Sequence, residues 1–328
     1  MKAIFAAALF AQATGALNIL MNNDDGFGVS NIRELYRLLV EAGHHVVMVA
    51  PATDQSGQGG RMSIDTSPTL SKATPYGIVP AGSPSLGRDP HDGNIWYYNG
   101  TPATCTMVAL DYVLPRFFPN MSTPDLFVAG PNFGNNVGTF AFTGSGTIGS
   151  TYTAIQRNIP GIAFSAANPT SSYLEVNSTN HPATLAAVQA VKFVNKLAKN
   201  TPAGKPLLPL GYGINVNIPN LNSTCSSPRL VQTRFSGKSG MPKLAFNETS
   251  GLVGLAGSPS NYLGYVTEGA NQCINGDCKL VGESVAVLEC ETAVTIFTVD
   301  YTAPVNDKTD GVVKAVFGGS TSCQPRKQ

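Results

Sequence analysis

Residues 17–50 alternate between short apolar runs and one amphipathic segment, and this order constrains the fold of the chain more than any other feature. Residues 17–22 form the first apolar run and residues 45–50 form the second. The apolar residues between the two runs recur at helical spacing, namely Ile32, Leu35, Tyr36 and Leu39. Two buried strands joined by a helix are typical of a parallel sheet. The pattern therefore predicts an α/β fold with a helix over 30–42, for which Ser30 is a suitable N-cap.

Strands and helices continue to alternate beyond residue 50, until strands dominate. The segment 51–94 is rich in Gly, Pro and Ser, so we expect loops there with one or two short strands. Further strands are expected at 95–98, 126–129 and 161–165. Helices are expected to begin at Thr101-Pro102, near Thr147 and at Pro182. Past residue 206 the expected strands are 211–218, 229–235, 284–291 and 293–302.

The composition excludes two classes of partner. The formal net charge is +1 and only 12% of the residues are charged, so the chain lacks the basic surface of proteins that bind nucleic-acid polymers. No run of about 18 apolar residues is present, so we expect no membrane-spanning helix. Thirty-four Gly and 23 Pro indicate a loop-rich α/β protein rather than a helical bundle.

Residues 1–16 have the features of a signal peptide. Lys2 provides the positive charge, the following residues up to Ala11 are mostly apolar, and Thr14-Gly15-Ala16 provides small residues before a cleavage point. A buried first helix is the alternative, but the first strand begins at once at Leu17. Secretion agrees with six cysteines and with glycosylation sequons at Asn99, Asn120, Asn177, Asn222 and Asn247. Asn99 is a doubtful glycan site because Pro102 follows its threonine.

Two adjacent carboxylates follow the first strand, in the sequence Asn23-Asp24-Asp25-Gly26. Two such charges cannot both ionise cheaply unless a cation lies between them. In an open α/β sheet, ligands bind at the carboxyl ends of the strands. The motif therefore points to a divalent cation held by Asp24 and Asp25. An ordinary turn is the alternative, because Asn, Asp and Gly all favour tight turns.

Four further motifs follow in a fixed order. Ala50-Pro51 and Ser56-Gly57 lie after the second strand, and Gly100-Thr101-Pro102 precedes Cys105. The run Gly130-Pro131-Asn132-Phe133-Gly134-Asn135-Asn136-Val137-Gly138 comes next, and Ser145-Gly146-Thr147 follows. With the Asp-Asp motif, this series resembles the survival protein E (SurE) family of metal-dependent nucleotidases and acid phosphatases. The resemblance spans roughly residues 17–303, and Glu283 to Ala303 looks like the family's last core strand.

The resemblance implies a fold and an activity. The fold would be a three-layer, Rossmann-like, mostly parallel sheet, with a catalytic core over 17–205 and a strand-rich C-terminal region over 206–328 that completes it. The activity would be hydrolysis of nucleoside monophosphates or of general phosphate monoesters. The family typically forms dimers that exchange C-terminal segments, so a homodimer or a higher oligomer is expected. The alternative is a secreted, catalytically silent relative that binds a ligand or a surface partner.

The resemblance also implies roles for individual residues. The metal ligands would be Asp24, Asp25, Ser56 and Asn132, whose hard oxygens suit Mg²⁺ or Mn²⁺, with Ca²⁺ as a further candidate. Asp24 would also orient or deprotonate the attacking water. The phosphate would be bound by Asn136, Gly144, Ser145, Gly146 and Thr147, beside a wall formed by Gly100 and Thr101. Taken singly, each of these residues is equally consistent with an ordinary loop, turn or helix cap.

The chain departs from the family pattern at two places, Thr104 and Ala129-Gly130-Pro131. These positions concern packing around the ligands, so they put the substrate preference in question more than the type of reaction. Six cysteines allow many disulfide pairings. We expect a Cys273–Cys278 bridge because Asn275-Gly276 between them favours a tight turn, and we expect Cys105 to be a buried thiol.

Overall fold

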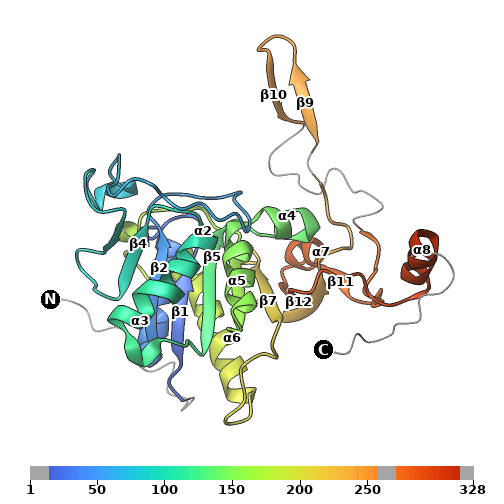
Figure 1. The fold of residues 1–328 in the computed structure, drawn as a ribbon, viewed down its shortest axis with the longest axis horizontal. Helices are drawn as coiled ribbons and strands as arrows, with labels where there is room; N and C mark the ends of the chain where they lie inside the picture. The colour runs from blue at the N-terminus through green and yellow to red at the C-terminus, as the bar shows by residue number, and fades with distance from the viewer. Residues whose placement is uncertain (1–14, 242, 257–270, 318–328) are drawn as a thin grey trace.

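A computed structural model describes residues 15–241, 243–256 and 271–317, and one ten-stranded sheet organises them (Figure 1). The strand order is β11 (Val281–Gly282), β8 (Leu230–Arg234), β12 (Thr292–Thr298), β7 (Tyr212–Ile218), β6 (Gly161–Ala166), β5 (Leu126–Phe133), β1 (Asn18–Asn22), β2 (His45–Pro51), β4 (Ile95–Tyr98) and β3 (Leu86–Arg88). The central strands pair in parallel, and the β3/β4 and β12/β7 pairs are antiparallel. The expected mostly parallel α/β sheet is confirmed.

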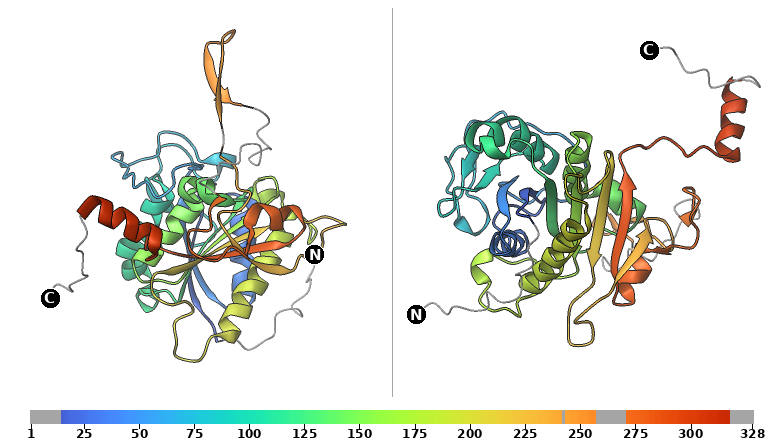
Figure 2. Two further views of the ribbon diagram at one scale, coloured as in Figure 1. Left: turned by 90° about the vertical axis from the view of Figure 1, so that its right-hand side faces the viewer. Right: turned by 90° about the horizontal axis from the view of Figure 1, so that it is seen from below.

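Helices cover both faces of the sheet and create three layers (Figure 2). Helices α1 (Ser30–Glu41) and α6 (Pro182–Asn200) pack on one face, where Leu35 and Val191 are fully buried with Met21 of β1. Helices α2 (Pro102–Val108) and α5 (Gly146–Gln156) pack on the other face, against Leu20 of β1. Helix α2 continues through a π-helical turn (Ala109–Val113) into α3 (Leu114–Phe117). Because strand side chains alternate between faces, one short strand contributes to both cores.

Three local expectations are corrected. The residue at the N-cap of α1 is Val29, and no side chain caps that end, since Ser30 is already the first helical residue. The run expected as a strand at 284–291 instead begins as helix α7 (Glu283–Leu288). A further helix, α4 (Gly138–Gly144), lies between the strand expected at 126–129 and the helix expected near Thr147, where no helix was expected. In the last two cases the sequence is short and ambiguous between states, and packing decides the outcome.

The C-terminal region extends the sheet and adds two peripheral elements. Strands β7, β8, β11 and β12 belong to the same sheet as β1. The hairpin of β9 (Leu244–Asn247) and β10 (Leu252–Leu255) projects from the rest of the molecule, and α8 (Asp307–Phe317) stands apart from the sheet (Figures 1 and 2).

Two disulfides lie in this region. Cys273–Cys278 has the expected pairing, and Cys225–Cys290 joins two segments 65 residues apart. Cys105 is a free, buried thiol, as expected. Cys323 and residues 1–14 of the expected signal peptide lie outside the described residues. Across the described ranges, no helix combines the length and apolar character needed to cross a membrane.

Candidate active site

Asp24 and Asp25 lie at the carboxyl end of β1, at the edge of the sheet where ligands bind in α/β folds. They are 2% and 7% exposed. Burial raises the pKa of Asp24, against the opposing effect of hydrogen bonds from Thr147. Burial, followed by the charge of Asp24, raises the pKa of Asp25 well above its ordinary value. Two buried carboxylates this close are therefore difficult to ionise without a cation.

Thr147 connects Asp24 to Asn132. Its hydroxyl oxygen lies 2.6 Å from Asp24 Oδ1 and 3.1 Å from Asn132 Oδ1, within hydrogen-bond distance of both. The amide nitrogen of Asn132 donates to the carbonyls of Phe133 and Gly134, at 2.8 Å each. These two bonds fix the amide so that its oxygen faces the Thr147 hydroxyl. Strand β1, strand β5 and helix α5 thus bring three polar side chains to one point.

A break in β5 places Asn132 at this point. The pairing of β5 with β6 shifts register between Ala129 and Asn132, and the Gly130-Pro131 peptide is cis. Gly130 has a φ of 89°, and a Cβ there would lie 2.2 Å from the carbonyl oxygen of Phe164. Only glycine combines that backbone conformation with such a close approach to the neighbouring strand. The backbone amide of Phe133 then donates to Asp25 Oδ2 at 3.0 Å.

The N-terminus of α5 packs directly on Asp24. A Cβ at Gly146 would lie 2.8 Å from Asp24 Cβ and 2.9 Å from Pro102 Cγ, so the helix backbone touches both. Ser145 caps the helix, accepting the backbone amide of Ile148 on its hydroxyl oxygen at 3.2 Å. The N-terminus of a helix carries partial positive charge and attracts anions. The site therefore joins a buried acidic pair to an anion-binding helix end.

Ser56 lies on an exposed loop after β2, and no hydrogen bond of its side chain joins it to the aspartates within the described residues. Its neighbour Gln55 contacts the site, because the backbone N–H of Gln55 donates to the backbone carbonyl of Asp24 at 2.7 Å. Asp54 on the same loop accepts the Ser56 amide at 2.8 Å, and its charge contributes to the raised pKa of both aspartates. Asp54 was not among the site residues predicted from the sequence, although it stands two residues before the motif serine.

Gly100 and Thr101 form a wall against the loop that follows Ser56. The Thr101 hydroxyl donates to the Arg61 carbonyl at 2.5 Å and also lies 2.9 Å from the Thr104 hydroxyl. At Gly100 a Cβ would lie 2.4 Å from the Tyr98 ring. The carbonyl of Gly144 accepts the amide of Gly59 at 3.0 Å. The loop is thereby attached both at the start of α2 and at the start of α5.

Asn136 lies in the loop between β5 and α4, and its hydrogen bonds join it to residues of β6 and β7. Its backbone amide donates to Asn217 Oδ1 at 2.8 Å, and its side-chain amide donates to the Ser165 hydroxyl at 3.1 Å. Asn215 donates both to the Asn136 carbonyl, at 3.0 Å, and to Glu283 Oε1, at 2.8 Å. Glu283 Oε2 accepts the amide of Gly138 at 2.8 Å. Buried groups of the C-terminal region therefore hold the loop that carries Asn136.

Three of these groups were not predicted from the sequence, namely Asn215, Asn217 and Glu283. Two asparagines spaced by two in an otherwise apolar strand were the available signal, since both face the same side of the sheet.

Comparison with known proteins identifies the family of the chain. The profile of the family described as "Survival protein SurE" matches residues 19–238. An acid phosphatase of Yarrowia lipolytica is 37% identical over 295 residues, covering 87% of this chain and 80% of that protein. A 5'-nucleotidase SurE of Lawsonia intracellularis is 31% identical over 212 residues, covering 63% of this chain and 67% of that protein.

Among solved structures, the SurE protein from Aquifex aeolicus superimposes with a TM-score of 0.61 at 24% identity. The match covers 91% of this chain and 98% of that one, and it supports the fold. The chain belongs to the survival protein SurE family of phosphoric monoester hydrolases.

Proposed function

We propose that this chain is a metal-dependent phosphomonoesterase that acts on nucleoside monophosphates or on general phosphate monoesters. The observation that carries the proposal is the meeting of the Asp24 carboxylate, the Asn132 amide oxygen and the N-terminus of α5 at Thr147. Such a site offers oxygen ligands for a cation beside amides that attract a phosphate. The two relatives named above are an acid phosphatase and a 5'-nucleotidase, which supports both substrate classes.

The residues at the site fit a hard divalent cation. Neither Asp24 nor Asp25 takes part in an ion pair with the described residues, so their charge has no protein counter-ion. No group of three or more His, Cys, Asp or Glu side chains that could hold a metal is found in the described ranges. Two carboxylates with neutral oxygens suit Mg²⁺ or Mn²⁺, which retain water and bind substrate phosphate. Asp24, Asp25 and Asn132 would hold the ion, with Ser56 supplying a hydroxyl.

The chain's own residues would perform the remaining steps. When bound, the cation supplies Lewis-acid polarisation of the phosphate and a lowered pKa of its water. Asp24 would orient a water and accept its proton through Oδ2, the carboxylate oxygen that Thr147 does not contact. The positive end of the α5 dipole would attract the phosphate oxygens and stabilise charge that develops on them. Asn136 contributes from the side of β7, and Gly100 and Thr101 bound the site.

Release of inorganic phosphate from AMP and from p-nitrophenyl phosphate tests the proposal. Activity is expected with added Mg²⁺ or Mn²⁺, loss in excess EDTA, and recovery when metal is restored. Full activity in EDTA, with no gain from metal, would contradict the metal site. No release from either substrate with any metal would favour the catalytically silent alternative. The ratio of the two rates separates a nucleotidase from a broad phosphatase.

We also propose that the protein is secreted after cleavage before Leu17. The signal-like residues 1–16 and two disulfides are the supporting observations, because disulfides persist in oxidising compartments. Mass spectrometry of the N-terminal peptide from culture medium provides the test. A cell-retained protein that keeps residues 1–16 would refute it.

A further inference from the structure

Asp54 is an acidic side chain beside the candidate metal site to which the proposed function gives no role. It lies on the loop that follows β2, two residues before Ser56, and it is exposed. Strand β2 pairs in parallel with β1, so this loop begins beside the turn of Asp24 and Asp25. Asp54 forms no ion pair with any described residue. Its carboxylate therefore adds a third negative charge to a region that already contains two.

The backbone of this loop packs on the turn that carries the two aspartates. The backbone N–H of Gln55 donates to the backbone carbonyl of Asp24 at 2.7 Å. A Cβ at Gly26 would lie 3.7 Å from the backbone nitrogen of Asp54. Burial is the main cause of the raised pKa of Asp24 and of Asp25, and the charge of Asp54 adds to the shift in both. Asp54 is thus close enough for its charge to act on both aspartates.

The side chain of Asp54 also fixes the backbone of Ser56. Asp54 Oδ1 accepts the backbone N–H of Ser56 at 2.8 Å. A hydrogen bond of this kind, from an aspartate to the amide two residues on, holds a loop in one local conformation. Because Ser56 is exposed on this loop, its hydroxyl depends on such a turn for a defined position.

We propose that Asp54 is a positioning residue of the metal site, which strengthens the binding of a divalent cation through its charge and by holding Ser56. The role rests on the metal-dependent activity proposed above, because it requires an ion at Asp24 and Asp25. Within the described ranges, no three His, Cys, Asp or Glu side chains form a group that could hold one ion, so Asp54 acts from outside the ligand set. A carboxylate at that range attracts a divalent cation without occupying a coordination position. Its effect falls on metal affinity and leaves the chemical step unchanged.

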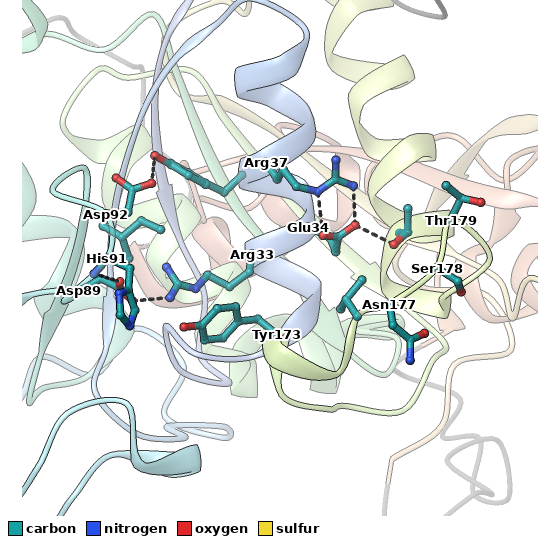
Figure 3. A pocket seen from close by; sticks show the side chains of 14 residues that line it. Arg33, Glu34, Arg37, Asp89, His91, Asp92, Tyr173, Asn177, Ser178 and Thr179 are labelled. Carbon is teal, nitrogen blue, oxygen red and sulfur yellow. Dashed lines mark hydrogen bonds and ion pairs between the residues drawn. The ribbon is translucent and has the colours of Figure 1, made fainter. Parts of the chain in front are cut away.

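Asp92 provides a matched control on the other edge of the sheet. Asp92 Oδ1 accepts the backbone N–H of Asn94 at 2.9 Å, which is the same kind of turn, and Oδ2 accepts the Tyr36 hydroxyl at 2.8 Å (Figure 3). Asp92 precedes β4, whereas Asp54 follows β2, and these two strands are parallel. Asp92→Asn therefore removes one charge from a similar turn at the edge opposite the candidate site.

Calorimetric titration of the full chain with Mn²⁺, without substrate, tests the role of Asp54. Asp54→Asn keeps the acceptor for the Ser56 amide but removes the charge, and we expect the Kd for Mn²⁺ to rise at least about fivefold. Asp54→Ala removes both, and its Kd should be at least about threefold higher than that of Asp54→Asn. Asp92→Asn should stay within about twofold of the wild type. Because Asp54 is exposed, melting curves in EDTA should be the same for the wild type and both Asp54 variants.

Two further readouts separate the charge from a purely structural role. The ratio of the Kd of Asp54→Asn to that of the wild type should fall when the ionic strength rises from about 0.01 M to about 0.15 M, because the screening length falls from about 30 Å to about 8 Å. With p-nitrophenyl phosphate, Asp54→Asn should need more Mn²⁺ for half-maximal activity, while kcat at saturating Mn²⁺ stays within about twofold.

The outcomes distinguish this role from the proposed function. Equal Kd values for the wild type and Asp54→Asn, or an equal rise in Asp92→Asn, would overturn the role of the charge. Equal Kd values for Asp54→Asn and Asp54→Ala would overturn the holding of Ser56. A wild type that binds no Mn²⁺ would overturn the metal site and, with it, the role of Asp54. The expected order of Kd values without any release of phosphate would support the role of Asp54 and contradict only the proposed activity.

Discussion

At the scale of single residues, Asp24 is the side chain on which the candidate site converges. It contacts Thr147 through its carboxylate and Gly146 through its Cβ. Asp24→Asn keeps the shape and the hydrogen-bonding oxygen but removes the charge. We expect kcat to fall by at least about a hundredfold, because the lost charge acts at the chemical step. Steady-state kinetics with saturating Mn²⁺ measures this.

The stability of the same variant provides its control. Burial raises the pKa of Asp24, so the ionised carboxylate costs stability at neutral pH in the absence of metal. Asp24→Asn should therefore melt in EDTA at the same temperature as the wild type or higher. Near-normal turnover by the variant would refute the site, whereas a large fall in Tm would show that the lost activity reflects unfolding.

The backbone contact of Gly146 leads to a second residue-scale prediction. A methyl group at this position would collide with Asp24 and Pro102, so Gly146→Ala must displace either the carboxylate or the start of α5. We expect kcat/KM to fall at least about tenfold. Gly93→Ala is the matched control, because a Cβ at Gly93 meets nothing within 4 Å. Equal activity of the two variants would show that the helix end does not need its present position.

Some of these residues could be predicted from the sequence because one rule places them. Asp24 and Asn132 each follow a predicted strand of a parallel sheet, and such strands end at one edge. Thr147 stands at the start of a predicted helix. Asn215 and Glu283 could not be predicted in this way. They reach the site from β7 and α7, and no local pattern states that these elements lie beside the loop of Asn136.

At the scale of elements, the first half of the fold was predictable and parts of the second half were not. Strand β2 and helix α1 have unambiguous periods, so their positions matched to within a residue or two. The apolar run after Gly282 was interpreted as a strand, yet it forms α7, because a run that short fits either state. Tertiary contact decides here, since Glu283 is fully buried against Gly138 and Asn215.

The stability that Glu283, the first residue of α7, contributes to the fold depends on pH. Burial raises its pKa from 4.5 to about 7. Between these values the folded state keeps a proton that the unfolded chain has released. The stability contributed by this group is therefore fully present below pH 4.5 and is lost as the pH rises to about 7, by about 3 kcal/mol.

Glu283→Gln should remove this dependence. In EDTA, we measure the Tm of the wild type minus the Tm of Glu283→Gln. We expect this difference to fall by on the order of 5 °C between about pH 4.5 and about pH 8. Glu175→Gln, a change on the exposed surface, should leave the wild-type profile intact. Calorimetric melting curves of the three proteins provide the measurement. Parallel pH profiles for wild type and Glu283→Gln would show that Glu283 titrates normally.

At the scale of the whole molecule, one sheet joins segments that are far apart in the chain. Strand β1 pairs with β5, and β12 pairs with β7. The sheet whose edge carries the site therefore includes strands from both the N-terminal and the C-terminal parts of the chain. The Cys225–Cys290 disulfide adds a covalent link between the start of β8 and the turn before β12. Truncation of the C-terminal region would therefore remove the partners of Asn136 as well as an outer part of the sheet.

The β9–β10 hairpin, like α8, stands outside this sheet, and it leads to the last prediction. It projects from the molecule, and Leu244, Phe246, Leu252 and Val253 are all more than 60% exposed (Figure 1). An isolated two-stranded hairpin is only marginally stable in water, and exposed apolar side chains on it favour a partner surface. A second copy of the chain is the partner that the family resemblance implies.

We therefore expect a homodimer or higher oligomer in which this hairpin is buried, and light scattering on the deglycosylated protein measures the mass. Phe246→Glu combined with Leu252→Glu should shift the mass to that of a single chain, because two charges would be buried at the contact. Leu174→Glu, at a residue 67% exposed on another part of the surface, should leave the mass unchanged. A single-chain mass for the wild type across micromolar concentrations would contradict the assembly. An oligomer that survives the double substitution would place the contact elsewhere, with α8 as the next element to change.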